Sequence, residues 1–276
     1  MSSSIVVLVT GGSRGIGRAV CLELARAPNV SVAFTFNRSQ DEANDVLQQL
    51  TQFSGADNNR KHSAHRCDVG DDAQCRTLVA AVVAEHGRLD ALVNNAGIAE
   101  EHDLGNNEVS LEHFMVTMRK IMDVNFFGAS SLTFQAVRQF QLQSSSTSST
   151  LNSASTTATS ASSSFSTAAG RIVNITSRAA YRGEHTAPGY ASSKAALSIF
   201  GQSLARRLGK DNIAIFSVAP GWVETEMAKD AVYGPGGAEV LAQHPLGRIA
   251  QPEEVANQVA YLVLQAPLAM TGTTVL

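Results

Sequence analysis

Short, nearly continuous apolar runs alternate along the chain with longer segments whose apolar positions recur at helical spacing. The apolar runs predict strands at Ile5–Val9, Val30–Phe36, Leu89–Val93, Arg171–Ile175 and Ile213–Val218, with a weaker strand near His65–Cys67. The segments between them predict helices at about residues 15–27, 40–53, 71–86, 111–140, 189–209 and 252–264. Apolar strands separated by helices are typical of a parallel sheet covered on both faces. We therefore expect an α/β protein with a doubly wound parallel sheet, formed as a single domain by residues 1–276.

One segment interrupts this alternation. Of the 24 residues from Ser144 to Thr167, 18 are Ser or Thr, and only Leu151 and Phe165 carry large apolar side chains. Such a composition cannot bury enough apolar surface to offset the entropic cost of ordering the chain. We expect a disordered surface insertion at residues 144–167, with a region for phosphorylation or glycosylation as the alternative.

Composition and charge narrow the possible partners and compartments. The net charge of −3 gives no electrostatic footprint for nucleic acid. Cys21, Cys67 and Cys75 have no metal-ligand spacing, and no carboxylate or thiol cluster accompanies His62 and His65. The sequence shows neither a signal peptide nor an apolar run approaching the ~18 residues of a membrane span. We expect reduced cysteines, no metal, no membrane contact and a cytoplasmic location.

A glycine-rich motif follows the first strand and opens the first helix. In "LVTGGSRGIGRAV", Gly11, Gly15 and Gly17 have the spacing G-x-x-x-G-x-G, a variant of the dinucleotide fingerprint. Such a turn needs positions without side chains, so that backbone N–H groups can face a pyrophosphate at the helix N-terminus. Because the strand and the helix flank the glycines, the motif predicts dinucleotide binding rather than only a tight turn.

The end of the second predicted strand indicates which dinucleotide is bound. An acidic residue about 20 positions after the glycines would hold a ribose 2′-hydroxyl. Here the chain reads Phe36-Asn37-Arg38, with no carboxylate before Asp41. Arg38 and Arg14 could clamp a 2′-phosphate, which favours NADP; two solvated arginines at helix starts are the alternative.

Two further motifs follow the third and fourth strands, at the sheet edge where ligands bind. They are "CDV", which contains Asp68, and "NNAG", which ends at Gly97. Asp68 could accept a hydrogen bond from an adenine amino group, or it could cap the helix that starts at Asp71.

Tyr190 and Lys194 lie four residues apart in a predicted helix and therefore share one face. A free phenol has a pKa of about 10, and a neighbouring ammonium group favours its ionised form. Lowering that pKa by about three units needs roughly 4 kcal/mol of stabilisation. The pair is therefore a candidate acid/base centre.

Seven motifs occur in one order: "TGGSRGIG", "CDV", "NNAG", "DVNFFGA" with Asn125, "IVNITS" with Ser177, "YASSK" and "PGWVET". In this order and at these intervals the chain resembles the short-chain dehydrogenase/reductase family, outside the Ser/Thr-rich segment. Among its members, it is most similar to 3-oxoacyl-[acyl-carrier-protein] reductases and related NADP-dependent carbonyl reductases. The resemblance implies a Rossmann-type fold and a soluble homodimer or homotetramer.

The resemblance also implies roles for individual residues. Tyr190 would be the acid/base, Ser177 would hold the substrate oxygen, and Asn125 would anchor a water in a proton relay. Lys194 would bind the nicotinamide ribose and lower the pKa of Tyr190. The expected NADP-binding residues are Gly11, Ser13, Arg14, Gly15, Ile16, Gly17, Asn37, Arg38, Asp68, Val69, Asn95, Ala96, Gly97, Tyr190, Lys194, Pro220, Gly221, Val223 and Thr225.

Other positions have no fixed role. Glu184 and His185 either line the substrate pocket or belong to a solvated loop, and residues 226–250 would form a substrate lid. The chain stops at "TGTTVL", before the tail that family members commonly use at a subunit interface, which leaves both homodimer and homotetramer open. Where carrier-dependent members have basic residues, this chain reads "SSSFSTAAG" and Lys210-Asp211, so we expect small free carbonyl substrates.

The sequence therefore predicts an NADPH-dependent reductase of a ketone or 3-oxoacyl group. A sugar or polyol dehydrogenase of the same fold is an alternative. A nucleotide-binding regulator without turnover is another, although such a protein would have no need of all four catalytic groups.

Overall fold

A computed structural model describes residues 4–54, 60–151, 168–242 and 244–276 of the chain. Its centre is a sheet of seven parallel strands in the order β3-β2-β1-β4-β5-β6-β7. The strands are β1 (Ile5–Val9), β2 (Val30–Phe36), β3 (Ser63–Arg66), β4 (Ala91–Asn94), β5 (Gly170–Ile175), β6 (Ile213–Val218) and β7 (Thr274–Val275). The predicted doubly wound parallel sheet is confirmed.

The strand order creates a switch point between β1 and β4. From β1 the chain builds outward through β2 and β3, and it then crosses back to place β4 on the other side of β1. In open α/β sheets, ligands bind in the crevice at the carboxyl ends of the strands beside such a point. The predicted cofactor motifs follow β1, β2, β3 and β4, so the topology brings them to one edge.

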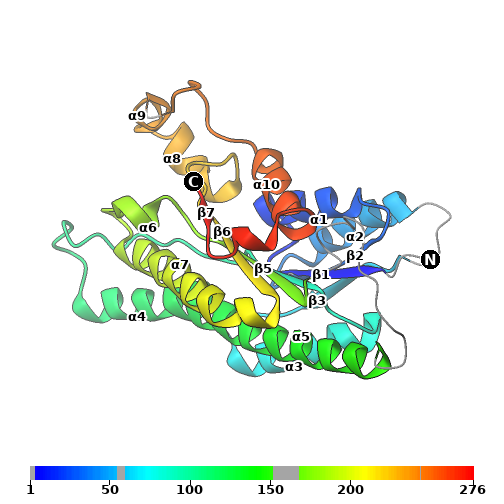
Figure 1. Cartoon of the computed structure of the whole chain (residues 1–276). Helices are drawn as coiled ribbons and strands as arrows, with labels where there is room; N and C mark the ends of the chain where they lie inside the picture. Colours follow the sequence, from blue (N-terminus) through cyan, green and yellow to red (C-terminus); the bar gives the residue numbers. More distant parts are fainter. Residues whose placement is uncertain (1–3, 55–59, 152–167, 243) are drawn as a thin grey trace.

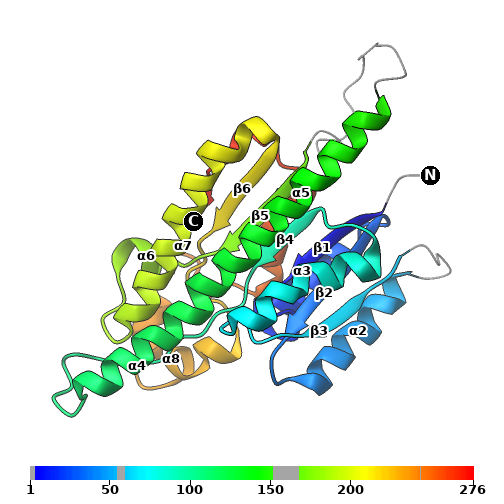
Figure 2. The same cartoon turned by 90° about the horizontal axis from the view of Figure 1, so that it is seen from below.

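Long helices cover both faces of the sheet (Figures 1 and 2). Helices α1, α2 and α10 pack on one face, and α3, α5 and α7 pack on the other. Their bounds are α1 (Gly15–Ala25), α2 (Gln40–Ser54), α3 (Asp72–His86), α5 (Ala129–Leu151), α7 (Pro188–Leu208) and α10 (Pro252–Leu264). Strands β1, β2, β4, β5 and β6 are almost entirely buried, as continuous apolar runs predict.

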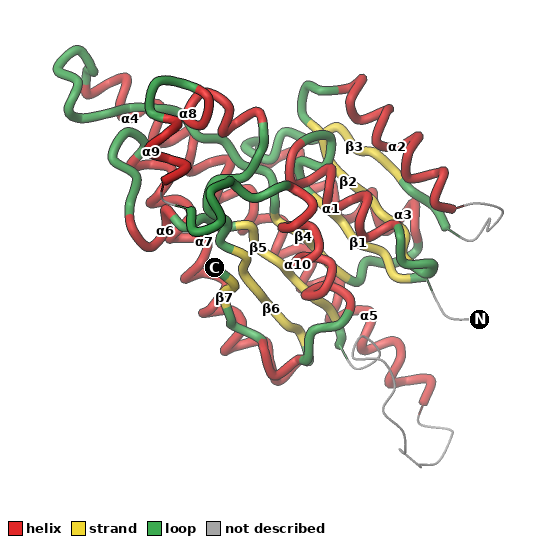
Figure 3. The backbone as a smooth tube through the Cα atoms, turned by 90° about the horizontal axis from the view of Figure 1, so that it is seen from above, coloured by secondary structure: helices red, strands yellow, loops and turns green. Residues whose placement is uncertain are grey.

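Shorter elements gather beyond the carboxyl ends of the strands. Figure 3 shows α6 (Ala179–Arg182), α8 (Lys229–Tyr233) and α9 (Gly237–Ala242) at one end of the sheet. The remaining elements are α4 (Leu111–Met122), a π-helical turn η1 (Asp123–Gly128) and the 3₁₀ turns η2 (Gly209–Asp211), η3 (Glu226–Ala228) and η4 (Leu268–Met270). In the described part of the chain, no helix has the length and apolar character needed to cross a membrane.

The segment predicted as one helix at residues 111–140 is divided in the structure. Helix α4 ends at Met122, the π turn η1 inserts extra backbone, and α5 then continues to Leu151. Helix α5 thus reaches eight residues into the Ser/Thr-rich segment that we expected to be disordered from Ser144. The buried side chains of Leu132, Ala136 and Phe140 anchor this helix, and Ser145 Oγ donates to Gln141 O at 2.9 Å. Residues 152–167 of that segment lie outside the described residues.

The fourth strand begins two residues later than predicted. Leu89 is buried, but its N–H donates to Gln143 Oε1 (2.9 Å) and its carbonyl accepts from Gln143 Nε2 (2.8 Å). These bonds to a side chain of α5 replace strand pairing at Leu89. The apolar run therefore predicts burial correctly and the start of the strand incorrectly.

Candidate active site

The glycine-rich turn has the backbone that its sequence predicts. Gly11 and Gly15 have φ angles of +66° and +55°, in the left-handed region that glycine tolerates. A Cβ atom on Gly17 would lie 2.2 Å from the carbonyl oxygen of Gly11, so no side chain fits there. Arg14, the N-cap of α1, is extended and supplies no side-chain cap, which leaves the first N–H groups of α1 for a ligand. An anion, such as a pyrophosphate, fits this turn.

The motif after β4 fastens the glycine turn to the sheet. Asn95 Nδ2 donates to the carbonyls of Thr10 (2.8 Å) and Gly11 (3.2 Å). Thr10 Oγ1 in turn accepts from the N–H groups of Asn95 and Ala96, both at 2.9 Å. The ends of β1 and β4 are thereby held together at the switch point. Asn95 and Ala96 thus hold the glycine turn in place at the predicted cofactor site.

The side chains predicted to select the cofactor follow the carboxyl ends of β2 and β3 or lie at the start of α1. Asn37 and Arg38 follow β2 directly and are exposed, as is Arg14. Asp68, after β3, is half-buried and accepts from the N–H of Gly70 at 3.0 Å. Asp71, not Asp68, caps α3 by accepting from Ala73 and Gln74, so the alternative capping role for Asp68 is wrong.

Asn125 and Lys194 converge on Gly97, which lies shortly after the end of β4. Asn125 is fully buried in η1, and it exchanges hydrogen bonds with the backbone of Ile98 at 2.8 and 2.9 Å. A Cβ atom on Gly97 would lie 3.1 Å from Lys194 Nζ and 3.3 Å from Asn125 Oδ1. Asn125 Nδ2 also donates to Ser193 Oγ at 3.0 Å, in the turn of α7 that carries Lys194. The π turn therefore places Asn125 against both the segment after β4 and helix α7.

Lys194 is buried in the protein interior. Its side chain is only 3% exposed, and Nζ donates to the carbonyl of Ile175 at 2.9 Å. Burial lowers the pKa of Lys194 to about 8, because removing an ammonium group from water disfavours its charged form. Nζ lies 5.9 Å from the centroid of the Tyr190 ring, as the shared helix face predicts.

Tyr190 and Ser177 interact, yet the phenol keeps its proton. Burial raises the pKa of Tyr190 above its usual value; the hydrogen bond with Ser177 lowers it, and the charge of Glu184 raises it further. Desolvation of the phenol thus outweighs its hydrogen bond with Ser177 in the protein alone, and the lowering of this pKa by Lys194 stays a prediction. A phenol that stays protonated can serve as an acid.

The segment 220–225 runs from the loop that carries Ser177 to the glycine turn. The N–H of Arg178, next to Ser177, donates to Pro220 O at 3.0 Å. At the other end, a Cβ atom on Gly15 would lie 3.3 Å from Thr225 Cγ2. Val223 is buried between these points and pairs with Ala250. The structure thus brings this motif into contact with both halves of the site.

His102 is a feature of the site that the sequence motifs did not reveal. Helix α7 begins at Pro188 after Ala187, which has no side chain able to cap it. His102 is buried, and its Nε2 accepts from the N–H of Gly189 at 2.9 Å, while Nδ1 donates to Glu100 O at 2.8 Å. His102 therefore caps the helix that carries Tyr190, from a loop 87 residues earlier in the chain.

The loop between Ser177 and Tyr190 divides into two parts. His185 is largely exposed and its Nδ1 lies 3.4 Å from Glu184 Oε1, whereas the Glu184 side chain is only 23% exposed. Tyr181 hydrogen bonds with Ser198 Oγ through its hydroxyl at 3.0 Å. Glu184 thus lies on the Tyr190 side, and His185 belongs to the solvated part of the loop.

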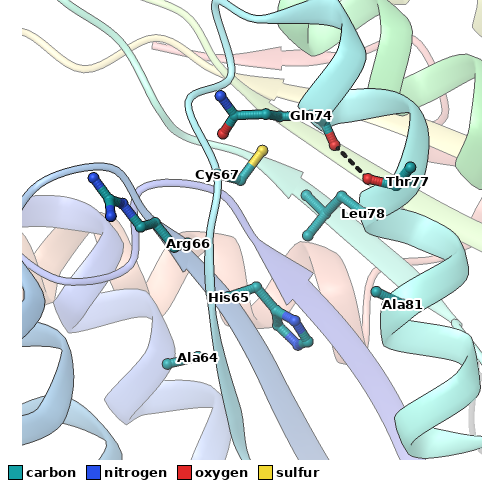
Figure 4. Close-up of a pocket in the computed structure, with 8 residues that line it drawn as sticks. All are labelled: Ala64, His65, Arg66, Cys67, Gln74, Thr77, Leu78 and Ala81. Atoms are coloured by element: carbon teal, nitrogen blue, oxygen red, sulfur yellow. Dashed lines mark hydrogen bonds between the residues drawn. The ribbon is translucent and has the colours of Figure 1, made fainter.

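A separate hollow of about 340 Å³ lies between β3 and α3 (Figure 4), and none of Asn125, Ser177, Tyr190 and Lys194 lines it. At the end of this region, the fold gathers His65, Glu85 and His86, whose ligand atoms all lie within 4.8 Å of one another. Ser63 Oγ hydrogen bonds with both imidazoles at 2.8 and 2.7 Å, and Lys61 pairs with Glu85 at 3.1 Å. These groups satisfy one another within the protein.

Comparisons with known proteins agree with this geometry. The chain matches the family model for short chain dehydrogenases over residues 5–234. An uncharacterised oxidoreductase of Methylorubrum extorquens is 32% identical over 98% of this chain and 94% of the relative. A 3-oxoacyl-[acyl-carrier-protein] reductase of Staphylococcus aureus is 28% identical over 97% of this chain and 94% of the relative. A short-chain dehydrogenase of Burkholderia cenocepacia, solved with NADP, superimposes with a TM-score of 0.78 at 28% identity, covering 99% and 96% of the two chains.

Proposed function

The chain belongs to the short-chain dehydrogenase family, and we propose that it is an NADPH-dependent reductase that converts a ketone or 3-oxoacyl carbonyl to an alcohol. The observation that carries this proposal is the convergence of Asn125, Lys194 and Gly97 on one side of the switch point. Tyr190 and Ser177 interact on the same edge, within reach of the glycine turn through residues 220–225. A nucleotide crevice and an acid therefore meet in one place.

NADP is the cofactor, and the residues present fit it. The glycine turn leaves no room for side chains where a pyrophosphate would lie. Arg14 and Arg38 are exposed and would bind a 2′-phosphate. Asp41, the first carboxylate after β2, lies in the first turn of α2. A guanidinium fork binds a phosphate dianion well, whereas a carboxylate at the strand end would repel it. When bound, NADPH supplies the hydride for the carbonyl carbon.

The chain itself supplies the proton and the orientation. Ser177 would hold the carbonyl oxygen, and Tyr190 would donate its phenolic proton to that oxygen as charge develops there. The pKa of Tyr190 is raised by burial, so the acid is in its protonated form at neutral pH. Lys194 would hold the nicotinamide ribose, and Asn125 would anchor a water in the relay that restores the proton.

The protein would assemble as a homodimer or homotetramer. Helices α4 and α5, with the π turn η1 between them, lie along one side of the molecule (Figure 2) and expose large apolar side chains. These are Leu111, Val116, Phe127, Phe134 and Leu142, between 55% and 77% exposed. Apolar side chains gathered along neighbouring helices are typical of surfaces that partners cover. A second copy of the chain would bury them.

A panel of carbonyl compounds assayed with NADPH and with NADH tests the proposal. Reduction of at least one ketone or 3-oxoacyl thioester with NADPH is expected, at a higher kcat/KM than with NADH. Turnover of sugars or polyols alone would favour the polyol dehydrogenase. Tight NADPH binding without turnover of any compound would favour a nucleotide-binding regulator.

A further inference from the structure

The guanidinium group of Arg178 lies beside the catalytic serine and has unused hydrogen-bond donors. Arg178 follows Ser177 directly, and its backbone N–H donates to Pro220 O at 3.0 Å. Its guanidinium carbon lies 3.4 Å from where a Cβ atom on Gly221 would stand. The side chain therefore lies between the serine loop and the loop that is expected to contact the nicotinamide.

Two nitrogens of this guanidinium group, Nε and Nη2, are buried and have no hydrogen-bond partner among the described residues. No ion pair in the described part of the chain includes Arg178 either. A buried donor without a partner costs about 1–3 kcal/mol, so each such group calls for an explanation. Arginine keeps its charge in proteins even where burial disfavours it. A positive charge with two free donors therefore stands next to Ser177.

The two donors that Arg178 leaves unused, Nε and Nη2, are the same two through which another arginine of this chain binds a carboxylate. Arg88 clamps Asp90 through the same two nitrogens, with Nε at 2.8 Å from Oδ2 and Nη2 at 2.6 Å from Oδ1. Parallel N–H groups in this fork match the two oxygens of a carboxylate, or two oxygens of a phosphoryl group. The shape of the vacant donor pair thus indicates an anion rather than a neutral acceptor.

His244, in the segment 226–250, adds to the same surroundings. Its Nε2 is buried and has no partner in the described part of the chain. Burial first, and then the positive charges of Arg178 and Arg182, lower the pKa of His244. Arg182 likewise lowers the pKa of Arg178, after burial. The charges of both arginines thus act on His244, in the segment expected to cover the substrate.

We propose that Arg178 and His244 form an anion subsite for the substrate, so that the carbonyl compound reduced here also carries a carboxylate or phosphoryl group. This proposal rests on the proposed reductase function and specifies the substrate class of that reductase. Arg178 follows Ser177 directly, and its guanidinium group lies against Gly221. An anion on Arg178 and a carbonyl oxygen on Ser177 would therefore belong to one small substrate, such as an oxo acid.

Matched substrates test the subsite directly. The kcat/KM with NADPH is measured for a short 3-oxo acid and its methyl ester, and for a hydroxyketone with and without a phosphate group. The wild-type protein is expected to prefer at least one anionic compound over its neutral counterpart by tenfold or more. A carboxylate preference and a phosphoryl preference both support the subsite and tell the two anions apart. Equal kcat/KM within both pairs would overturn it.

The variant Arg178→Gln separates substrate recognition from other roles. It should reduce the anionic preference to about one, by raising KM for the anion, while kcat/KM for the ester stays within about threefold. Arg76→Gln, which removes an exposed charge on α3, should leave both values unchanged. A weaker NADPH Kd with an intact anionic preference would show that Arg178 contacts the cofactor, and would overturn the proposal.

A measurement on the wild-type protein covers the case in which Arg178→Gln does not fold. Short carboxylates or inorganic phosphate should inhibit reduction of the methyl ester, competitively with the ester and not with NADPH. Lack of such inhibition would count against the subsite. If the ester is reduced but anions are neither preferred nor inhibitory, only the subsite fails. If NADPH reduces none of the four compounds or the wider panel, the reductase function fails with it.

Discussion

Replacement of Lys194 by methionine should stabilise the protein at neutral pH while it removes activity. Burial lowers the pKa of Lys194 from 10.5 to about 8. At 1.36 kcal/mol per pKa unit, holding the charged ammonium in the fold costs about 3 kcal/mol. The substitution also removes the 2.9 Å bond to Ile175 O, which costs about 1–3 kcal/mol. The free energy of unfolding at pH 7 should therefore rise by about 1 kcal/mol.

The effect of Lys194 on the free energy of unfolding depends on pH. Between pH 8 and 10.5 the unfolded chain holds a proton on Lys194 that the folded protein has released. Stability contributed by this position therefore rises with pH over that window, and the full cost is present below it. Urea unfolding at pH 7 and pH 9.5 should show the wild-type protein gaining about 2 kcal/mol relative to Lys194→Met.

A matched variant separates burial from charge. Lys210 is exposed, so Lys210→Met should change stability by less than about 0.5 kcal/mol at either pH. A Lys194→Met protein that is less stable than wild type at pH 7, or a difference that does not change with pH, would show that Lys194 is not held at a desolvation cost.

Three further predictions concern the cofactor, the catalytic helix and the substrate. Arg38→Asp should shift the kcat/KM ratio toward NADH; an unchanged ratio would remove Arg38 from cofactor selection. His102→Ala should remove the acceptor for the Gly189 N–H, destabilise the protein by about 1 kcal/mol and lower kcat. His102→Asn keeps an acceptor and should recover part of the stability and of the kcat. Wild-type stability and kcat in His102→Ala would exclude a positioning role for His102. An acetoacetyl group on an acyl carrier should be reduced no better than on a short thioester, because the charges of Lys210 and Asp211 cancel and the basic patch is reduced to Arg206 and Arg207. A carrier advantage above about tenfold, roughly 1.4 kcal/mol, would restore a role for an acidic carrier.

The sequence predicted those parts of the site that depend on local backbone. Gly11 and Gly17 could be predicted from the sequence because the local backbone of this turn accepts only glycine at these positions. The spacing of Tyr190 and Lys194 likewise fixes a shared helix face before any fold is known. Apolar runs indicated β1, β2 and β6 with their observed bounds, because buried parallel strands leave little room for polar residues.

The sequence could not reveal features that arise from contacts between distant segments. Nothing near His102 in the sequence indicates that its acceptor reaches Gly189. The π turn that directs Asn125 has no signature of its own, so residues 111–140 read as one continuous helix. The unused donors of Arg178 become visible only when every possible partner around them is known. Whether a buried polar atom has a hydrogen-bond partner depends on the folded chain, and the sequence motifs do not reveal it.

The most direct measurement compares the Tyr190→Phe variant with the wild-type protein. The kcat for carbonyl reduction and the NADPH Kd are determined for both. Loss of the phenolic proton should lower kcat at least 100-fold, since a positioned acid contributes about 10²–10⁴-fold, while the NADPH Kd stays within about threefold. A variant that keeps more than about a tenth of the wild-type kcat would show that Tyr190 is not the proton donor.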